Sequence, residues 1–225
     1  MVRTLSGGRG SAWEDYGPVS KWHAPALAAV LAAVLVATTG VTSAFAATTW
    51  TVRPGGTISL TSGLFIVTDV PTGTIIVCAS SSLSGALPSG SGHPGTGIGS
   101  LTAGRIRYCG NLGMFTLAAG DLPWHLNFTS YNATARTVTG SISHLHIGVF
   151  KPDCHAVVDG TSGTAGDGIV RFTYTNSTAK LKALTTGGNL HFYNVQGCAG
   201  LLRNRDPATV SASFPVSPKQ VITSP

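Results

Sequence analysis

Apolar and polar residues alternate with a period of two along most of the chain from Thr49 onward. The segment 124–129 places Trp, Leu and Phe at every second position, and the segment 170–175 does the same with Val, Phe and Tyr. Side chains of a β-strand point alternately to its two faces, so this pattern predicts strands with one buried face. No long amphipathic pattern with a period of 3.6 residues is present there. We therefore expect an all-β fold.

Turn residues separate about ten such segments, as expected of short antiparallel strands. A series of this kind predicts an antiparallel β-sandwich or a closed β-barrel, and the pattern does not distinguish between the two. It also leaves open whether a barrel is filled or encloses a small apolar ligand. The segment 80–99, which is rich in Ser, Gly and Pro, is expected to form a long surface loop.

The phase of the alternation changes once within the segment 136–150. Val138 and Ile142 occupy even positions, whereas the apolar residues at 145, 147 and 149 occupy odd ones. A bulge or a bend near Ser143 would explain this change. Further along, the glycines of 185–188 predict a hairpin that joins strands at 181–184 and 189–195.

The N-terminal part of the chain has the features of an export signal. Residues 26–37 are all Ala, Val or Leu, and basic residues precede them. This run is shorter than the ~20 apolar residues of a membrane-spanning helix, and Ala44-Phe45-Ala46 matches a signal-peptidase site. We expect residues 1–46 to be a cleaved signal peptide with a long polar head. Residues 47–225 would form a single secreted domain, not membrane-spanning, which is extracellular or loosely associated with the cell wall.

The four cysteines of an exported chain predict disulfide bonds. Cys78–Cys109 and Cys154–Cys198 is the favoured pairing, because cysteines that are neighbours in sequence need no long crossover. The spacings contain no C-x-x-C pair, which disfavours a zinc site made of these cysteines.

The predicted mature domain carries eleven basic and six acidic residues, a net charge of +5. The basic residues are dispersed along the sequence, whereas nucleic-acid binders concentrate them on one face, so we expect no nucleic-acid partner. Attraction to a cell-wall glycan or a lipid surface is consistent with this charge, and solubility alone explains it best.

Five sequence blocks stand out in the segment after the leader: TTWTVRPGG (48–56), VVDGTSG (157–163), YTNSTAKLK (174–182), GGNLHFYNVQGCAGLL (187–202) and VSPKQVITSP (216–225). Together they resemble a group of secreted actinobacterial proteins that have no established activity. The resemblance covers most of that segment and implies export and an all-β domain, without implying any site residues.

Histidines are the main candidates for chemistry. His144 and His146 have i and i+2 spacing, which places both on the same face of a strand. With His155 or His191 nearby, three imidazoles could bind zinc or copper, and a metal-dependent enzyme is the alternative function. Two solvent-facing histidines on a sheet are the simpler interpretation.

Other motifs are weaker. The segment 159–167, DGTSGTAGD, offers oxygens that calcium could use, but it lacks the spacing of an EF-hand, and a glycine-rich hairpin is favoured. Ser177 and Lys180 match S-x-x-K, which is interpreted as a turn because the companion motifs are missing. The six dispersed aspartates do not suggest paired catalytic carboxylates.

Tyr131 and Tyr193 are the candidate residues for stacking against sugars. The sequence thus favours a secreted, disulfide-stabilised β domain that acts as a surface or binding module without catalytic activity. No cofactor is expected beyond the metal alternatives above, and the oligomeric state is left open.

Overall fold

The computed structural model describes residues 48–110 and 114–225, and the predicted signal peptide therefore lies outside the described residues. The regular structure of these two segments is β-strand, and no helix there is long and apolar enough to cross a membrane. The first eight strands are β1 (Thr49–Arg53), β2 (Gly56–Ser62), β3 (Phe65–Asp69), β4 (Ile75–Leu87), β5 (Gly90–Pro94), β6 (Gly99–Cys109), β7 (Thr116–Gly120) and β8 (Trp124–Asn132). The remaining seven are β9 (Thr137–Lys151), β10 (Cys154–Asp159), β11 (Gly168–Thr175), β12 (Lys180–Ala183), β13 (His191–Gln196), β14 (Ala208–Ser217) and β15 (Val221–Thr223).

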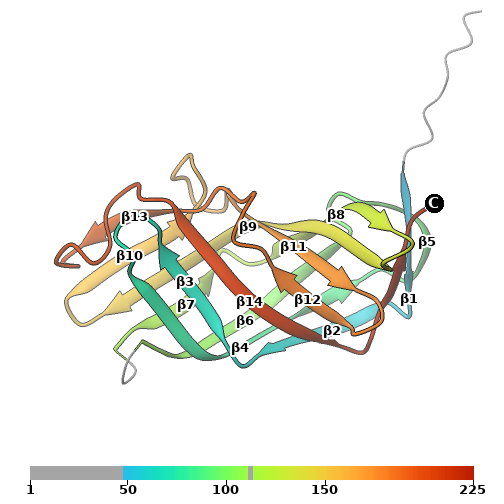
Figure 1. Cartoon of the computed structure of the whole chain (residues 1–225), viewed down its shortest axis with the longest axis horizontal. Coiled ribbons are helices and arrows are strands. Elements are labelled where there is room, and N and C mark those ends of the chain that lie inside the picture. The colour runs from blue at the N-terminus through green and yellow to red at the C-terminus, as the bar shows by residue number, and fades with distance from the viewer. Residues whose placement is uncertain (1–47, 111–113) are drawn as a thin grey trace, which may run out of the picture. The chain divides into compact units, whose positions relative to one another are not determined.

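Eight antiparallel strands close into a barrel. The hydrogen-bonded order is β2-β4-β6-β8-β9-β11-β12-β14, and β14 pairs with β2 to complete the ring. The all-β prediction is confirmed. Of the two predicted architectures, the strands adopt the closed barrel. Closure also leaves these strands with paired edges (Figure 1).

The long strands β4, β9 and β14 change partners along their length, so the sheet continues beyond this ring. The first residues of β4 pair with β3, and the later ones pair with β2. β9 likewise pairs first with β8 and then with β7, while its other edge passes from β11 to β10. β13 pairs with the free edge of β10.

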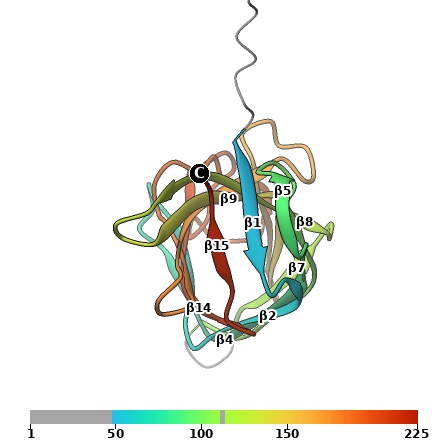
Figure 2. The same ribbon diagram turned by 90° about the vertical axis from the view of Figure 1, so that its right-hand side faces the viewer.

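One end of the barrel is covered by a small sheet of order β15-β1-β5 (Figure 2). Trp50 and Val52 of β1 and Ile222 of β15 are buried. The ring of Trp50 packs edge-on against Phe128 of β8, with 5.2 Å between the ring centroids. This sheet therefore extends the apolar core of the barrel at that end.

The barrel interior beneath this sheet is filled with side chains. The apolar cavity that is lined by residues including Ile58, Leu126 and Phe172 measures about 20 Å³. This volume is enough for about one water molecule. The cavity therefore has no room for the enclosed apolar ligand that a hollow barrel would hold.

The predicted change of phase in β9 is confirmed as a β-bulge. Gly168 lies opposite Leu145 and Ile169 lies opposite Ser143, so His144 has no partner in the register. His144 adopts a left-handed backbone conformation with φ of 61° and is exposed. The extra residue turns Leu145 into the core.

The predicted loop at 80–99 is wrong. Serines and small residues continue β4 as far as Leu87, and the segment then forms β5. Leu83 and Leu87 point into the core, and the backbone between them pairs with both β2 and β6. The predicted hairpin around 185–188 is also wrong, because β12 pairs with β11 and β14 whereas β13 pairs with β10.

Both predicted disulfides are confirmed. Cys78–Cys109 joins directly opposite positions of β4 and β6, and Cys154–Cys198 joins the start of β10 to the segment after β13. All four cysteines are thus oxidised, which indicates an oxidising compartment.

Candidate functional site

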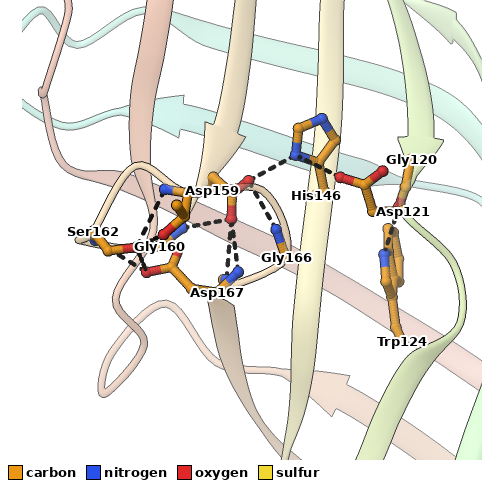
Figure 3. Close-up of polar contacts among 11 residues, drawn as sticks. Gly120, Asp121, Trp124, His146, Asp159, Gly160, Ser162, Gly166 and Asp167 are labelled. Atoms are coloured by element: carbon orange, nitrogen blue, oxygen red, sulfur yellow. Dashed lines mark hydrogen bonds and ion pairs between the residues drawn. The ribbon is translucent and has the colours of Figure 1, made fainter.

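A polar cluster forms where β7, β9 and β10 meet. His146 of β9 pairs with Gly120, the last residue of β7, and Asp121 follows immediately. On the other side of β9, β10 ends at Asp159. The Nδ1 atom of His146 lies 2.6 Å from Oδ2 of Asp159 and 3.4 Å from Oδ2 of Asp121 (Figure 3). One imidazole is thus held between two carboxylates.

The carboxylate of Asp159 also organises the loop that follows it. Its side chain is almost completely buried. Oδ1 accepts hydrogen bonds from the N–H groups of Gly160, Asp167 and Gly168 at 2.9, 3.1 and 3.2 Å. Oδ2 accepts another from Gly166 at 3.2 Å. A buried carboxylate requires such donors, and here the loop supplies them.

Asp167 closes the same loop through Ser162. Burial opposes the charged form of Asp167, but hydrogen bonds from the hydroxyl and backbone N–H of Ser162 outweigh it, and the pKa of Asp167 is lowered. Both carboxylate oxygens of Asp159 and Oδ2 of Asp167 thus already accept hydrogen bonds from the loop, whereas the buried Oδ1 of Asp167 has no hydrogen-bond partner among the described residues. The predicted glycine-rich hairpin is wrong, because the flanking strands β10 and β11 do not pair with each other and the segment is a loop between them. Calcium binding stays a prediction.

The four histidines proposed as metal ligands have separate environments. His144 packs against His125 with 4.7 Å between ring centroids, whereas His146 contacts the two aspartates. His155 packs against Phe150, and His191 donates from Nδ1 to the carbonyl oxygen of Asn189 at 2.9 Å. In the part of the chain that the structure describes, no three His, Cys, Asp or Glu residues are placed to hold a metal ion. The predicted histidine set is therefore not assembled.

The chemistry open to His146 follows from its partners. Its Nδ1 atom is directed to Asp159, an arrangement that orients the ring and leaves Nε2 as the free nitrogen. Within residues 48–110 and 114–225, the hydrogen-bond and ion-pair partners of His146 are Asp159 and Asp121 alone. Nucleophilic catalysis would also need a hydroxyl or thiol bonded to the imidazole. The cluster as it stands fastens β7 and the 160–167 loop to β9.

A second pair of carboxylates lies at the end of β3. Asp69, the last residue of β3, is fully buried and accepts hydrogen bonds from the N–H groups of Thr72 and Arg203 at 3.1 and 3.3 Å. Asp206 lies close by, because Ala208, the residue of β14 that pairs with Asp69, follows it by two positions. Burial and then the negative charge of Asp69 raise the pKa of Asp206, and Arg203 offsets only part of this effect. The two residues are 137 positions apart in the chain, so the sequence did not suggest the pair.

Replacing Asp206 by asparagine is expected to stabilise the protein at neutral pH. Because the folded-state pKa of Asp206 is raised, the folded protein loses stability as the pH rises from the ordinary carboxyl pKa through the raised value. The asparagine variant removes this loss, so its melting temperature should exceed that of the wild type at pH 7 and approach it below about pH 4. Thermal unfolding across this pH range measures the difference.

Asp153→Asn is the matched control, since Asp153 is exposed in the turn between β9 and β10. An Asp206→Asn variant that is less stable than the wild type at pH 7 would contradict the assigned repulsion.

A surface cleft lies beside the small end sheet. Its volume is about 280 Å³, and its walls come from the β8–β9 hairpin, the β11–β12 turn and the segment around β15. The lining residues are Tyr131, Arg136, Asn176, Ser177, Lys219, Val221 and Thr223. Ser177, the serine of the S-x-x-K pattern, lies in the β11–β12 turn as predicted.

Asn176 holds the floor of this cleft in place. Its side chain is buried, donates to the carbonyl oxygen of Ile222 at 2.7 Å and accepts from the N–H of Ile222 at 2.9 Å. Its own N–H donates to the carbonyl oxygen of Arg136. The Nζ atom of Lys219 donates to the carbonyl oxygen of Ser177 at 3.0 Å. These bonds tie the three cleft-forming segments together.

The two tyrosines proposed for stacking differ in their surroundings. Tyr131 is half-buried, with one part packed against the core and another lining the cleft. Tyr193 donates from its hydroxyl to the carbonyl oxygen of Thr161, and Gly163 lies against its ring. A Cβ atom at Gly163 would come within 2.8 Å of that ring. Tyr131 is therefore the better placed of the two for a ligand.

The basic side chains of the described segments form no ion pairs with aspartates. Among the eleven Arg and Lys residues there, none has a side-chain nitrogen within 4.0 Å of a carboxylate oxygen. Meanwhile, Asp69, Asp159 and Asp167 accept internal hydrogen bonds. Arg136 and Lys219 thus bring two unpaired cations to one cleft. Sequence reasoning missed both, because 83 residues separate them and no motif joins them.

No protein-family model, no curated protein and no solved structure matches this chain.

Proposed function

We propose that this domain is a secreted, non-enzymatic binding module that holds an anionic cell-wall glycan in the cleft formed by Tyr131, Arg136 and Lys219. The observation that supports it most is the cleft itself, where an aromatic side chain and two cations without acidic partners line the same hollow. A phosphate- or carboxylate-bearing polysaccharide would satisfy both kinds of group.

The two cations define the charge of the ligand. Arg136 and Lys219 are exposed, and no acidic residue lines the cleft. Hydrogen bonds between such cations and phosphate or carboxylate oxygens are stronger than those between neutral groups. A net charge of +5 over the described domain adds a long-range attraction for a polyanion.

Tyr131 adds an apolar surface on which a sugar ring can lie. The tyrosine side chain has an apolar ring and a polar hydroxyl, so it can contact both the C–H groups and the hydroxyls of a sugar. The cleft volume of about 280 Å³ is near the lower limit of small-ligand sites. We therefore expect it to hold a single repeating unit of a polymer.

The test is binding of the purified protein to a poly(glycerol phosphate) polymer and to polygalacturonate, with neutral dextran as the reference. Binding should be confined to the anionic polymers and should weaken as salt is added, because exposed charges are screened. The double variant Arg136→Ala/Lys219→Ala should bind at least about tenfold more weakly, since two charge-assisted contacts are lost. Tyr131→Ala should weaken binding by a smaller factor.

The matched control is Arg105→Ala/Arg107→Ala, which removes the same charge from exposed positions on β6. If both double variants lost polymer binding equally, the effect would be a non-specific effect of charge. If the cleft variant bound the polymers as well as the wild type does, this cleft would not be the binding site. The two anionic polymers distinguish phosphate from carboxylate recognition.

A further inference from the structure

The outer face of β3 and β4 carries a row of exposed apolar side chains. Leu64, Ile75 and Val77 expose 56%, 60% and 39% of their surface. Ile66 lies directly opposite Val77 in the β3–β4 pair and extends the row onto β3. Tyr108, which is 71% exposed, extends it onto β6. We call these five residues the apolar strip. Contiguous apolar surface of this kind marks an interaction site.

The strip is a sheet face, and its strands are not open edges. β3 pairs with β14 on one side and with β4 on the other, and from Cys78 onward β4 pairs with β6 along its second edge (Figure 1). Most of the backbone beneath the strip is therefore already hydrogen-bonded. The side chains of the strip are thus the main groups that it offers to a partner.

Basic residues border the strip. Arg105 and Arg107 are exposed on β6, next to Tyr108. On the opposite side, Lys182 of β12 shares a groove of about 490 Å³ with Leu64 and Ile66. The strands β3, β4, β6, β12 and β14 contain one acidic residue, Asp69, which is fully buried. The exposed residues of these five strands therefore combine aliphatic side chains with positive charge.

We propose that the apolar strip docks the protein onto a bilayer surface that contains anionic lipids. The aliphatic side chains would enter the boundary between head groups and acyl chains, and Arg105, Arg107 and Lys182 would contact the lipid phosphates. Tyr108, with its apolar ring and polar hydroxyl, suits the interface between the two. This surface shares no residue with the Tyr131 cleft and does not depend on the function proposed for that cleft.

The test is partitioning of the protein into vesicles of phosphatidylcholine with about one third phosphatidylglycerol, followed by sedimentation. Ile75→Thr/Val77→Thr is the main variant, because threonine keeps the β-branched shape at these exposed positions and the fold should persist. It should partition about tenfold more weakly than the wild type. Arg105→Ala/Arg107→Ala should also bind about tenfold more weakly and should respond less to salt.

The reciprocal control is Arg136→Ala/Lys219→Ala, which should bind vesicles as the wild type does while losing the anionic glycan. All variants are prepared in the same way and differ only at the named residues, so a difference among them reports on the strip. Equal partitioning of the Ile75/Val77 variant and the wild type would overturn the proposal, and so would binding that is no weaker to pure phosphatidylcholine vesicles. A concentration-dependent dimer that the same variant abolishes would assign the strip to a second copy of the chain instead.

Discussion

Replacing Cys154 and Cys198 together by alanine is expected to lower the free energy of unfolding by about 4 kcal/mol. The bond closes a loop with a sequence separation of 44 residues, and its loss frees that loop in the unfolded chain. Among the described residues, β13 pairs along its length with β10, and on its other side His191 and Phe192 bond to the segment 205–207. The disulfide therefore also fastens a strand that has few other attachments near Cys198. Urea unfolding of the variant and the wild type measures the change.

Hydrogen exchange shows where the effect falls. Amides of β13 and of the segment that leads to β14 should exchange faster in the alanine variant, whereas amides of β4 and β6 should keep their protection. The matched variant Cys78→Ala/Cys109→Ala should show a similar loss of stability, without faster exchange in β13. A loss below about 1 kcal/mol with unchanged exchange would contradict the role given to this bond.

The second large effect is expected for Asp159→Asn, which should destabilise the protein by about 3–5 kcal/mol. The buried carboxylate accepts four backbone hydrogen bonds and contacts His146 at 2.6 Å. An amide group has one oxygen, so its NH₂ must face some of these donors and leave them unsatisfied. Chemical unfolding measures the loss.

His146→Asn tests the contact between His146 and Asp159 separately from the backbone hydrogen bonds that Asp159 accepts. It should cost less than Asp159→Asn, because Asp159 keeps all its backbone donors. Asp153→Asn, at an exposed turn, should change stability little. If Asp159→Asn were as stable as the wild type, the carboxylate would not be what holds the 160–167 loop.

Local patterns in the sequence predicted much of the fold. The change of parity between Ile142 and Leu145 was enough to place the bulge, because a bulge displaces every following side chain to the other face. Pairing of neighbouring cysteines predicted both disulfides. These features depend on residues that are close in sequence or on the alternation within one strand.

Other parts of the fold depend on distant partners. The serine-rich segment 80–87 looked like a loop, but it is held as a strand by β2 on one side and β6 on the other. Strand propensity in such a case is decided by neighbouring strands more than by the residue type. The same reason explains why the pairing of β13 was predicted wrongly. We expected it to pair with the preceding strand, β12, but it pairs with β10, which lies earlier in the chain.

The candidate sites show a similar division. Tyr131 was identified as a stacking candidate from its aromatic character. Arg136 and Lys219 become neighbours only when β15 folds back across the barrel end, and Asp69 and Asp206 meet only through the β3–β14 pair. Histidine spacing was misleading, because the bulge directs His144 toward His125 while His146 contacts the aspartates.

The most direct test of the cleft is chemical-shift mapping by nuclear magnetic resonance, with isotope-labelled protein and short poly(glycerol phosphate). Our account predicts that the largest shifts will occur at Tyr131, Arg136, Ser177 and Lys219, and that Arg136→Ala/Lys219→Ala will abolish them. Shifts confined to the apolar strip or to the His146 cluster, or none with any anionic polymer, would contradict it.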